Sequence, residues 1–345
     1  MSPHKSGFIN KYKKRDVQEM ETAMTKSETL RTVKSVISEV QKAVIGKDDI
    51  IIKVLLAILS KGHILIDDIP GVGKTTMALA FAKALDLKHN RMQFTPDVLP
   101  TDVTGFSIYN KATGKFDYKP GVIMCNLFLA DEINRTSSKT QSALLEVMAE
   151  GKITVDGVTR VLPQPFMVIA TQNPVGSVGT QMLPESQLDR FMIRITMGYP
   201  DIESEISIIK SKQSANPLDS VKRVAGADEI IMMQKVAESV YIDDKVYMYI
   251  AKLIEATRNH PLIKLGVSPR GTLALASITK ATALLKGRDY VIPDDVAFIF
   301  KDVTAHRILL SSKARINDVT VSDVTDEILS SVRIPEMSKK KHYVS

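Results

Sequence analysis

The most constraining feature of the sequence is the segment ILIDDIPGVGKTT at residues 64–76. A short apolar run opens it and strong helix formers follow it, which predicts a strand, a tight loop and a helix. The segment matches the phosphate-binding pattern G-x-x-x-x-G-K-[ST], except that Asp68 stands where that pattern has its first glycine. Aspartate tolerates left-handed backbone, so the turn can still form, and we expect its carboxylate to face away from any phosphate.

The loop carries the groups that a nucleoside triphosphate requires. Gly71 and Gly73 let the backbone approach the phosphates, and a helix N-terminus lies behind them. Lys74 can reach the β- and γ-phosphates, and the Thr75 hydroxyl can bind Mg²⁺. The predicted nucleotide-binding residues are Pro70, Gly71, Val72, Gly73, Lys74, Thr75 and Thr76. The alternative is a tight strand–helix turn that binds no ligand.

A second motif, NLFLADEINR, begins 52 residues after Lys74. This separation leaves room for strand–helix units between the two motifs. It is an apolar strand that ends in two acids, Asp131 and Glu132. Asp131 can hold Mg²⁺ through a water molecule, and Glu132 can polarise an attacking water. The two motifs together predict nucleotide hydrolysis.

The chain has 345 residues and a net charge of +7, and most of that charge lies in two polar tails. Residues 1–27 hold six Lys or Arg against three acids, and residues 333–345 hold four against one. Solvated tails explain this better than a nucleic-acid surface does. No apolar run is long enough to predict a transmembrane span, and the N-terminus has no signal-peptide core.

Cysteine and histidine usage argues against disulfide and zinc chemistry. Cys125 is the single cysteine, so a disulfide within the chain is impossible and a reducing, cytoplasmic location is predicted. Its apolar surroundings predict a small core residue. The six histidines are scattered, and none pairs with another ligand at zinc spacing.

The order of elements predicts an α/β fold followed by a helical domain. Apolar strands are expected at residues 63–66, 91–95, 122–132, 166–174 and 190–198. They alternate with helices, including one predicted over 27–46, which implies a parallel sheet covered on both faces. After Pro200 helical periodicity dominates. The predicted divisions are a flexible basic tail at 1–27, a core at 28–198 and a helical domain at 199–345.

Two segments interrupt the strand–helix alternation. Residues 96–121 hold three prolines and three glycines with scattered aromatics, which indicates loop or hairpin structure. Residues 151–163, GKITVDGVTRVLP, alternate around Asp156-Gly157, a hairpin signal. We expect neither segment to hold a cluster of basic and aromatic residues, which argues against nucleic-acid binding.

The chain resembles the MoxR family of AAA+ ATPases. The resemblance rests on six motifs in the family's order: IPGVGKT, QFTPDVLPTDVTG, FLADEINRTSSKTQSALLEVMAEGKITVDG, VIATQNP, LPESQLDRFMIRITMGYP and GVSPRGTLAL. It covers about residues 30–333. It implies an AAA+ P-loop core with a five-stranded parallel sheet, an all-α lid, and hydrolysis of ATP with Mg²⁺.

The resemblance also assigns roles to residues outside the two motifs. Asn173 matches the polar residue that orients the attacking water, and Arg190 matches an arginine finger that reaches a neighbouring subunit. Arg270 matches the lid arginine that senses the γ-phosphate, and Ile45 and Gly46 match the segment that flanks adenine. The alternatives are an asparagine that closes a turn, an arginine paired with Asp189, and a plain interhelical turn.

By the same resemblance, the protein is expected to form a homo-oligomeric ring, hexameric in the family's usual form, and to remodel protein clients. Relatives act with von Willebrand factor A-domain proteins and help mature or insert metal into enzyme complexes; in related rings the two inserted segments face the pore. Three alternatives remain: a nucleic-acid or chelatase-type motor, a small-molecule phosphotransferase, and a nucleotide-gated binding protein with low turnover.

Overall fold

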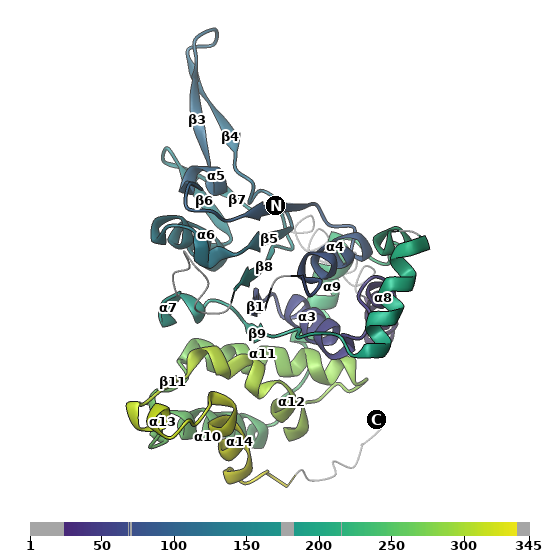
Figure 1. Cartoon of the computed structure of the whole chain (residues 1–345), viewed down its shortest axis with the longest axis vertical. Helices are drawn as coiled ribbons and strands as arrows, with labels where there is room; N and C mark the ends of the chain where they lie inside the picture. Colours follow the sequence, from purple (N-terminus) through teal and green to yellow (C-terminus); the bar gives the residue numbers. More distant parts are fainter. Residues whose placement is uncertain (1–23, 68, 70, 174–182, 215, 337–345) are drawn as a thin grey trace, which may run out of the picture.

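The computed structural model describes residues 24–67, 69, 71–173, 183–214 and 216–336. Its centre is a five-stranded parallel sheet in the order β2-β5-β8-β1-β9 (Figure 1). The bounds of these strands are β1 Ile64–Asp67, β2 His89–Gln93, β5 Leu127–Asp131, β8 Met167–Gln172 and β9 Ile193–Ile195. All five predicted strands are present, and the predicted α/β fold class is confirmed.

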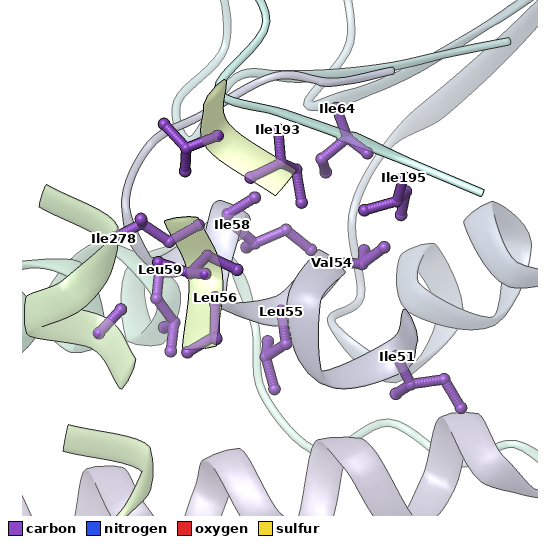
Figure 2. Close-up of a cluster of buried hydrophobic side chains, with 14 of the residues drawn as sticks. Ile51, Val54, Leu55, Leu56, Ile58, Leu59, Ile64, Ile193, Ile195 and Ile278 are labelled. Carbon is purple, nitrogen blue, oxygen red and sulfur yellow. The ribbon is translucent and has the colours of Figure 1, made fainter. Parts of the chain in front are cut away.

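Alternate strand residues pack on opposite faces of this sheet. Ile64 and Ile66 join a large cluster with helices α2 (Lys26–Gln41), α3 (Asp48–Leu59) and α4 (Lys74–Ala84). Leu65 joins a separate cluster with α6 (Ser138–Glu150). Figure 2 shows the α3 side of the first cluster, where α3 residues lie near Ile64, Ile193 and Ile195. Burial on both faces explains why β1, β5 and β8 are mainly apolar, whereas the edge strand β2 is polar and largely exposed.

The helix predicted over 27–46 ends earlier, at Gln41. Val44 turns into the core, and Gly46 has a φ of +71°. A Cβ on Gly46 would lie 2.1 Å from Ser204 Oγ, so both the close approach and the left-handed backbone favour glycine here. Tertiary packing therefore stops this helix before its sequence pattern does.

The strand predicted over 122–132 is also shorter, because β5 begins at Leu127. The backbone amides of Val122 and Ile123 donate to the carbonyls of Asp102 and Val103, not to the sheet. Cys125 lies in this connection and is buried, as predicted for a core residue. Burial raises the pKa of its thiol to about 11.

The two inserted segments form hairpins on one side of the core. The first contains α5 (Pro100–Thr104) and the projecting strands β3 (Gly105–Asn110) and β4 (Lys115–Pro120), and the second pairs β6 (Lys152–Val155) with β7 (Val158–Val161) (Figure 1). The Arg160 guanidinium lies 3.8 Å from the centre of the Tyr118 ring, which joins the hairpins.

The expectation that these insertions lack a basic–aromatic cluster is wrong. The exposed rings of Tyr109 and Phe116 meet edge to face at 5.4 Å near the tip of the first hairpin. Lys111 and Lys115 belong to the same tip. Cross-strand pairing brings together residues that are separated in sequence by the turn.

The helical region after the core packs beside β9 and α3 (Figure 1). Its elements are α8 (Ile202–Ser214), η2 (Pro217–Ser220), α9 (Ala227–Glu238), α10 (Asp244–Asn259), α11 (Pro269–Leu285), α12 (Pro293–Thr304), η3 (Ala305–Arg307), α13 (Ser312–Ile316) and α14 (Val321–Ser331). A small antiparallel pair, β10 (Ile263–Leu265) with β11 (Leu309–Leu310), adds to the predicted helical lid. Within the described residues, no helix is both long and apolar enough to cross a bilayer.

Candidate active site

The predicted phosphate-binding loop joins β1 to α4. Gly71 and Gly73 have φ values of +89° and +96°, in the left-handed region that favours glycine. A Cβ on Gly71 would meet nothing within 4 Å, so the loop leaves open space at this position. Lys74 begins α4, and its side chain is largely buried. Asp68 and Pro70 lie outside the described residues.

Asp131 is the last residue of β5, and its carboxylate is already held in place. It accepts a hydrogen bond from Arg91 Nε at 2.6 Å and another from Thr171 Oγ1 at 3.3 Å. The residue is 5% exposed, whereas the Arg91 side chain is half exposed. Arg91 on β2 and Thr171 on β8 therefore fix the orientation of the Asp131 carboxylate. Asp131 and Thr75 are the two predicted magnesium ligands.

Glu132 follows Asp131 in a left-handed conformation, with φ of +56°. Its backbone amide donates to Thr171 Oγ1 at 2.9 Å. Its two carboxylate oxygens accept from Asn173 Nδ2 at 3.0 Å and from Arg135 Nη1 at 2.8 Å. Backbone in this region costs energy for a residue with a Cβ, and such positions gather at functional sites.

These hydrogen bonds decide the charge of Glu132. Burial alone would raise the pKa of this carboxyl, but bonds from Arg135 and Asn173 outweigh it and hold the pKa below its ordinary value. Glu132 is therefore ionised and able to accept a proton at neutral pH. The buried Oδ1 of Asn173 has no hydrogen-bond partner among the described residues, so it can accept one from a water molecule.

Parallel pairing gathers the loop, Glu132 and Asn173 at one edge of the sheet. Asp67 at the end of β1 is level with Gln172 at the end of β8, and β5 pairs with the other side of β8. Since all three strands run the same way, the segments that follow them meet at the carboxyl edge, where open α/β sheets bind ligands.

The segment predicted to flank adenine adjoins the same region. Gly46 packs against Ser204, and Lys47 Nζ donates to the Tyr199 carbonyl at 2.9 Å. A Cβ on Gly73 would lie 3.9 Å from Met197 Cε. The chain that leaves β9 thus contacts both the phosphate-binding loop and residues 45–47, which is compatible with the prediction for Ile45 and Gly46.

The structure places Arg190 and Arg270 away from the phosphate-binding loop, in a different pocket. Arg190 lies between α7 (Glu185–Leu188) and β9, at the amino edge of the sheet. Its Nη1 donates to the Leu145 carbonyl at 2.9 Å, and its buried Nε has no partner among the described residues. Arg190 and Arg270 line a pocket of about 320 Å³ that also contains Lys61, Gly62, His63, Met148, Asp189, Met192, Leu273, Ala274, Ser277 and Arg307.

The sequence and the fold of this chain are similar to those of known ATPases. Residues 63–193 match the family described as "ATPase family associated with various cellular activities (AAA)", and residues 255–328 match the AAA lid domain. YeaC of Bacillus subtilis is 47% identical over 87% of this chain and 93% of its own length. Chaperone MoxR1 of Mycobacterium tuberculosis is 36% identical over 90% of this chain and 84% of its own.

The chain belongs to the MoxR family of AAA+ ATPases. A crystal structure of a proposed ATPase from Cytophaga hutchinsonii superposes with a TM-score of 0.85 at 36% identity, covering 93% of this chain and 99% of that one. The predicted family and fold are thereby confirmed. The two family matches leave residues 194–254 between them, so the predicted division at residue 198 stays a prediction.

Sequence reasoning missed three residues of this MoxR-family site: Arg91, Arg135 and Thr171. Arg135 lies three residues after Glu132, a spacing that brings side chains together on one turn of helix and that could have revealed it. Arg91 and Thr171 reach Asp131 from neighbouring strands, across 40 residues of sequence in each case. No local pattern marks those two.

The residues present fit a bound Mg²⁺–nucleotide. The glycine backbone leaves space for phosphates, and Asn173 offers a buried acceptor that is not yet used. Within the described part of the chain, no group of three His, Cys, Asp or Glu side chains could hold a metal by itself. A magnesium ion at Asp131 and Thr75 would therefore take its other ligands from phosphate oxygens and water, as Mg²⁺ commonly does.

Proposed function

We propose that the protein hydrolyses ATP, with Glu132 as the residue that polarises the attacking water. The observation that carries this proposal is the 3.0 Å hydrogen bond from Asn173 to Glu132, at the sheet edge where the phosphate-binding loop begins. One Glu132 oxygen is fixed by Asn173 and the other by Arg135, so the carboxylate has a defined direction. The Oδ1 of Asn173, which has no partner among the described residues, would accept a hydrogen bond from the same water.

The loop residues supply binding rather than proton transfer. Backbone N–H groups near Gly71 and Gly73 and the ammonium of Lys74 would hold the phosphates at the N-terminus of α4. Thr75 and Asp131 would hold Mg²⁺, which when bound neutralises charge on the phosphates. Ile45 and Gly46 would flank the adenine ring.

We propose further that the active site is shared between subunits of a homo-oligomeric ring, with six subunits as in the family's usual form. Arg190 lies before β9 and the loop lies after β1, at opposite ends of paired parallel strands. Four strand residues span on the order of 13 Å, and this length of sheet separates the Arg190 backbone from its own loop. Arg190 and Arg270 would both serve the ATP of a neighbouring subunit.

The biological role that fits best is remodelling of a protein client, because the relative MoxR1 is described as a chaperone. We propose a client complex that includes a von Willebrand factor A-domain protein, and maturation or metal insertion as the outcome. A cytoplasmic location rests on the lone Cys125 and stays a prediction from the sequence.

Phosphate release from ATP without any added acceptor tests the enzymatic proposal. The wild-type protein should release phosphate, and Glu132→Gln should bind ATP as tightly but release phosphate about 10²-fold more slowly. Release that requires an added small-molecule acceptor would instead indicate a phosphotransferase. Turnover near zero in the wild type, with ATP-dependent partner binding, would indicate a nucleotide-gated binding protein.

One observation favours a nucleic-acid motor as a second candidate. The exposed Tyr109–Phe116 pair, with Lys111 and Lys115 nearby, has the combination of rings and cations that binds single strands. Binding of a single-stranded DNA oligonucleotide that weakens steeply with salt, and that is lost in Tyr109→Ala/Phe116→Ala, would support this candidate.

A further inference from the structure

The residue before Arg190 is held by the lid. Asp189 accepts a hydrogen bond from Arg307 Nε at 2.7 Å, and its two carboxylate oxygens accept from Ser268 Oγ at 3.1 and 2.9 Å. Ser268 is also the N-cap of α11, and Arg307 ends η3. The alternative pairing of Asp189 with Arg190 is therefore replaced by an ion pair with a residue 118 positions later.

Arg307 holds the backbone on both sides of Arg190 as well. Its Nη2 donates to the carbonyls of Asp189 at 3.2 Å and Phe191 at 2.5 Å, and its Nη1 donates to Met192 at 3.2 Å. Nη1 also donates to the Val303 carbonyl within the lid. A guanidinium has five N–H donors in a fixed plane, and all five are used here.

Full use of these donors separates Arg307 from the other arginines of the pocket. Arg307 lines the same pocket as Arg190 and Arg270 and is 5% exposed. It has no N–H left for a phosphate, whereas Arg190 Nε has no partner among the described residues. Arg307 can therefore act on the reaction by fixing Arg190, but not by touching the nucleotide.

The absence of a side chain at Gly271 leaves room in the lid for the Arg307 side chain. A Cβ on Gly271, in the first turn of α11, would lie 2.7 Å from Arg307 Cδ and 2.5 Å from Val267 Cγ1. Any larger residue would have to displace the Arg307 stem. Gly271 thus allows α11 and η3 to approach closely enough for Ser268 and Arg307 to bind the same carboxylate.

We propose that Arg307 is a positioning residue that fixes the Arg190 segment from the lid, so that docking of the lid in one subunit controls hydrolysis in the next. This inference rests on the proposed role of Arg190 in a neighbouring subunit. It adds a defined physical link between the lid and the segment that carries Arg190. The Arg307 side chain binds one carboxylate and three carbonyl groups at residues 189–192.

The test uses full-length protein with Arg307→Ala, Arg307→Lys and, as a matched lid control, the exposed Arg315→Ala. Arg307→Ala should bind ATP with unchanged affinity and lose turnover by about 10²-fold, the loss typical of a catalytic group misplaced by 1 Å. Arg307→Lys should lose nearly as much, because an ammonium cannot reproduce the planar set of donors. Arg315→Ala should match the wild type.

Mixed assemblies distinguish positioning from a general loss of structure. Subunits with Arg307→Ala and with Glu132→Gln, carrying different tags, are co-expressed and the mixed oligomers isolated. An Arg307→Ala subunit keeps Glu132 and receives a well-placed Arg190 from its Glu132→Gln neighbour, so activity should exceed that of either parent. Loss of ATP affinity in Arg307→Ala, or mixed oligomers as inactive as the parents, would overturn the inference.

A parallel mixture of Arg190→Ala with Glu132→Gln separates this inference from the proposed function. If that mixture regains activity and the Arg307→Ala mixture does not, the shared site stands and the positioning role fails. If neither regains activity, the shared site itself fails. Should Arg307→Ala not fold, Gly271→Ala displaces the Arg307 stem while keeping its charge, and the same restoration is expected of it in the mixture.

Discussion

The side-chain amide of Asn173 donates to the carboxylate of Glu132 across 3.0 Å, and it joins residues that follow two neighbouring parallel strands. The contact spans 41 residues of sequence. It gives Glu132 a fixed direction at the edge of the sheet where the phosphate-binding loop lies. In the proposed mechanism this pair would supply the general base and the amide that orients the attacking water, within one hydrogen bond of each other.

Removal of Arg135 should change the pH dependence of hydrolysis. Arg135 helps to hold the pKa of Glu132 below its ordinary value, so Arg135→Ala should raise that pKa. A base must be deprotonated to work, so the acid limb of the kcat–pH profile should move to higher pH. Arg333→Ala, which removes a 90% exposed arginine that pairs with Glu336 and not with Glu132, is the control. An acid limb that stays in place would show that Glu132 ionisation does not limit turnover.

Lys74→Ala should weaken ATP binding by at least about tenfold. A hydrogen bond to a charged group contributes about 1.5–3 kcal/mol, and this variant loses the ammonium while keeping the loop. Isothermal titration calorimetry with ATP measures the effect, and Lys34→Ala on the exposed side of α2 serves as the control. A dissociation constant within about a factor of two of the wild-type value would contradict the assignment of the loop.

Arg190→Ala and Glu132→Gln should each be nearly inactive alone and active together. An arginine finger that acts between subunits can be worth about 10³–10⁵ in rate, a range set by GTPases. In a mixed oligomer, an Arg190→Ala subunit supplies Glu132 and its Glu132→Gln neighbour supplies Arg190. Phosphate release should peak at intermediate ratios of the two. Inactive oligomers that verifiably contain both subunits would place Arg190 within its own site or give it only a structural role.

Acidification should destabilise the fold through His63. The buried ring is fixed as one neutral tautomer, since Nε2 lies 2.9 Å from the Met148 carbonyl and Nδ1 accepts from the Val168 amide at 3.0 Å. Burial lowers the pKa of His63 to about 4, so below its ordinary value of 6.5 the unfolded chain binds a proton that the folded chain does not. Stability is thus lost as pH falls from about 7.5 to about 5, by on the order of 2 kcal/mol.

Chemical denaturation at the two pH values measures this loss, and His63→Gln should remove most of it while lowering stability at both. His306 is buried too, and burial lowers its pKa well below the ordinary value, so a residual slope in the same direction is expected. An unaltered slope in His63→Gln would rule out His63 as its source.

Much of the local structure follows from the sequence because its causes are local. Gly71, Gly73 and Lys74 specify a loop before a helix through backbone freedom and a helix N-terminus. Ser268 specifies the start of α11 by capping it, as its hydroxyl does when it accepts from the Gly271 amide at 3.2 Å. The apolar strands predict a sheet buried on both faces, which the packing of Ile64 and Leu65 into separate clusters confirms.

The sequence by itself therefore determined the strand–loop–helix at residues 64–84, the acids that end β5 and the order of α/β core and helical lid, because these depend on short-range preferences and hydrophobic period. Only the tertiary structure decided which side chains meet: Arg91 and Thr171 at Asp131, and Arg307 at Asp189. It also placed Arg190 and Arg270 away from Lys74. Such contacts depend on strand order and on how the lid packs. The residues next to each partner in the sequence contain no pattern that predicts them.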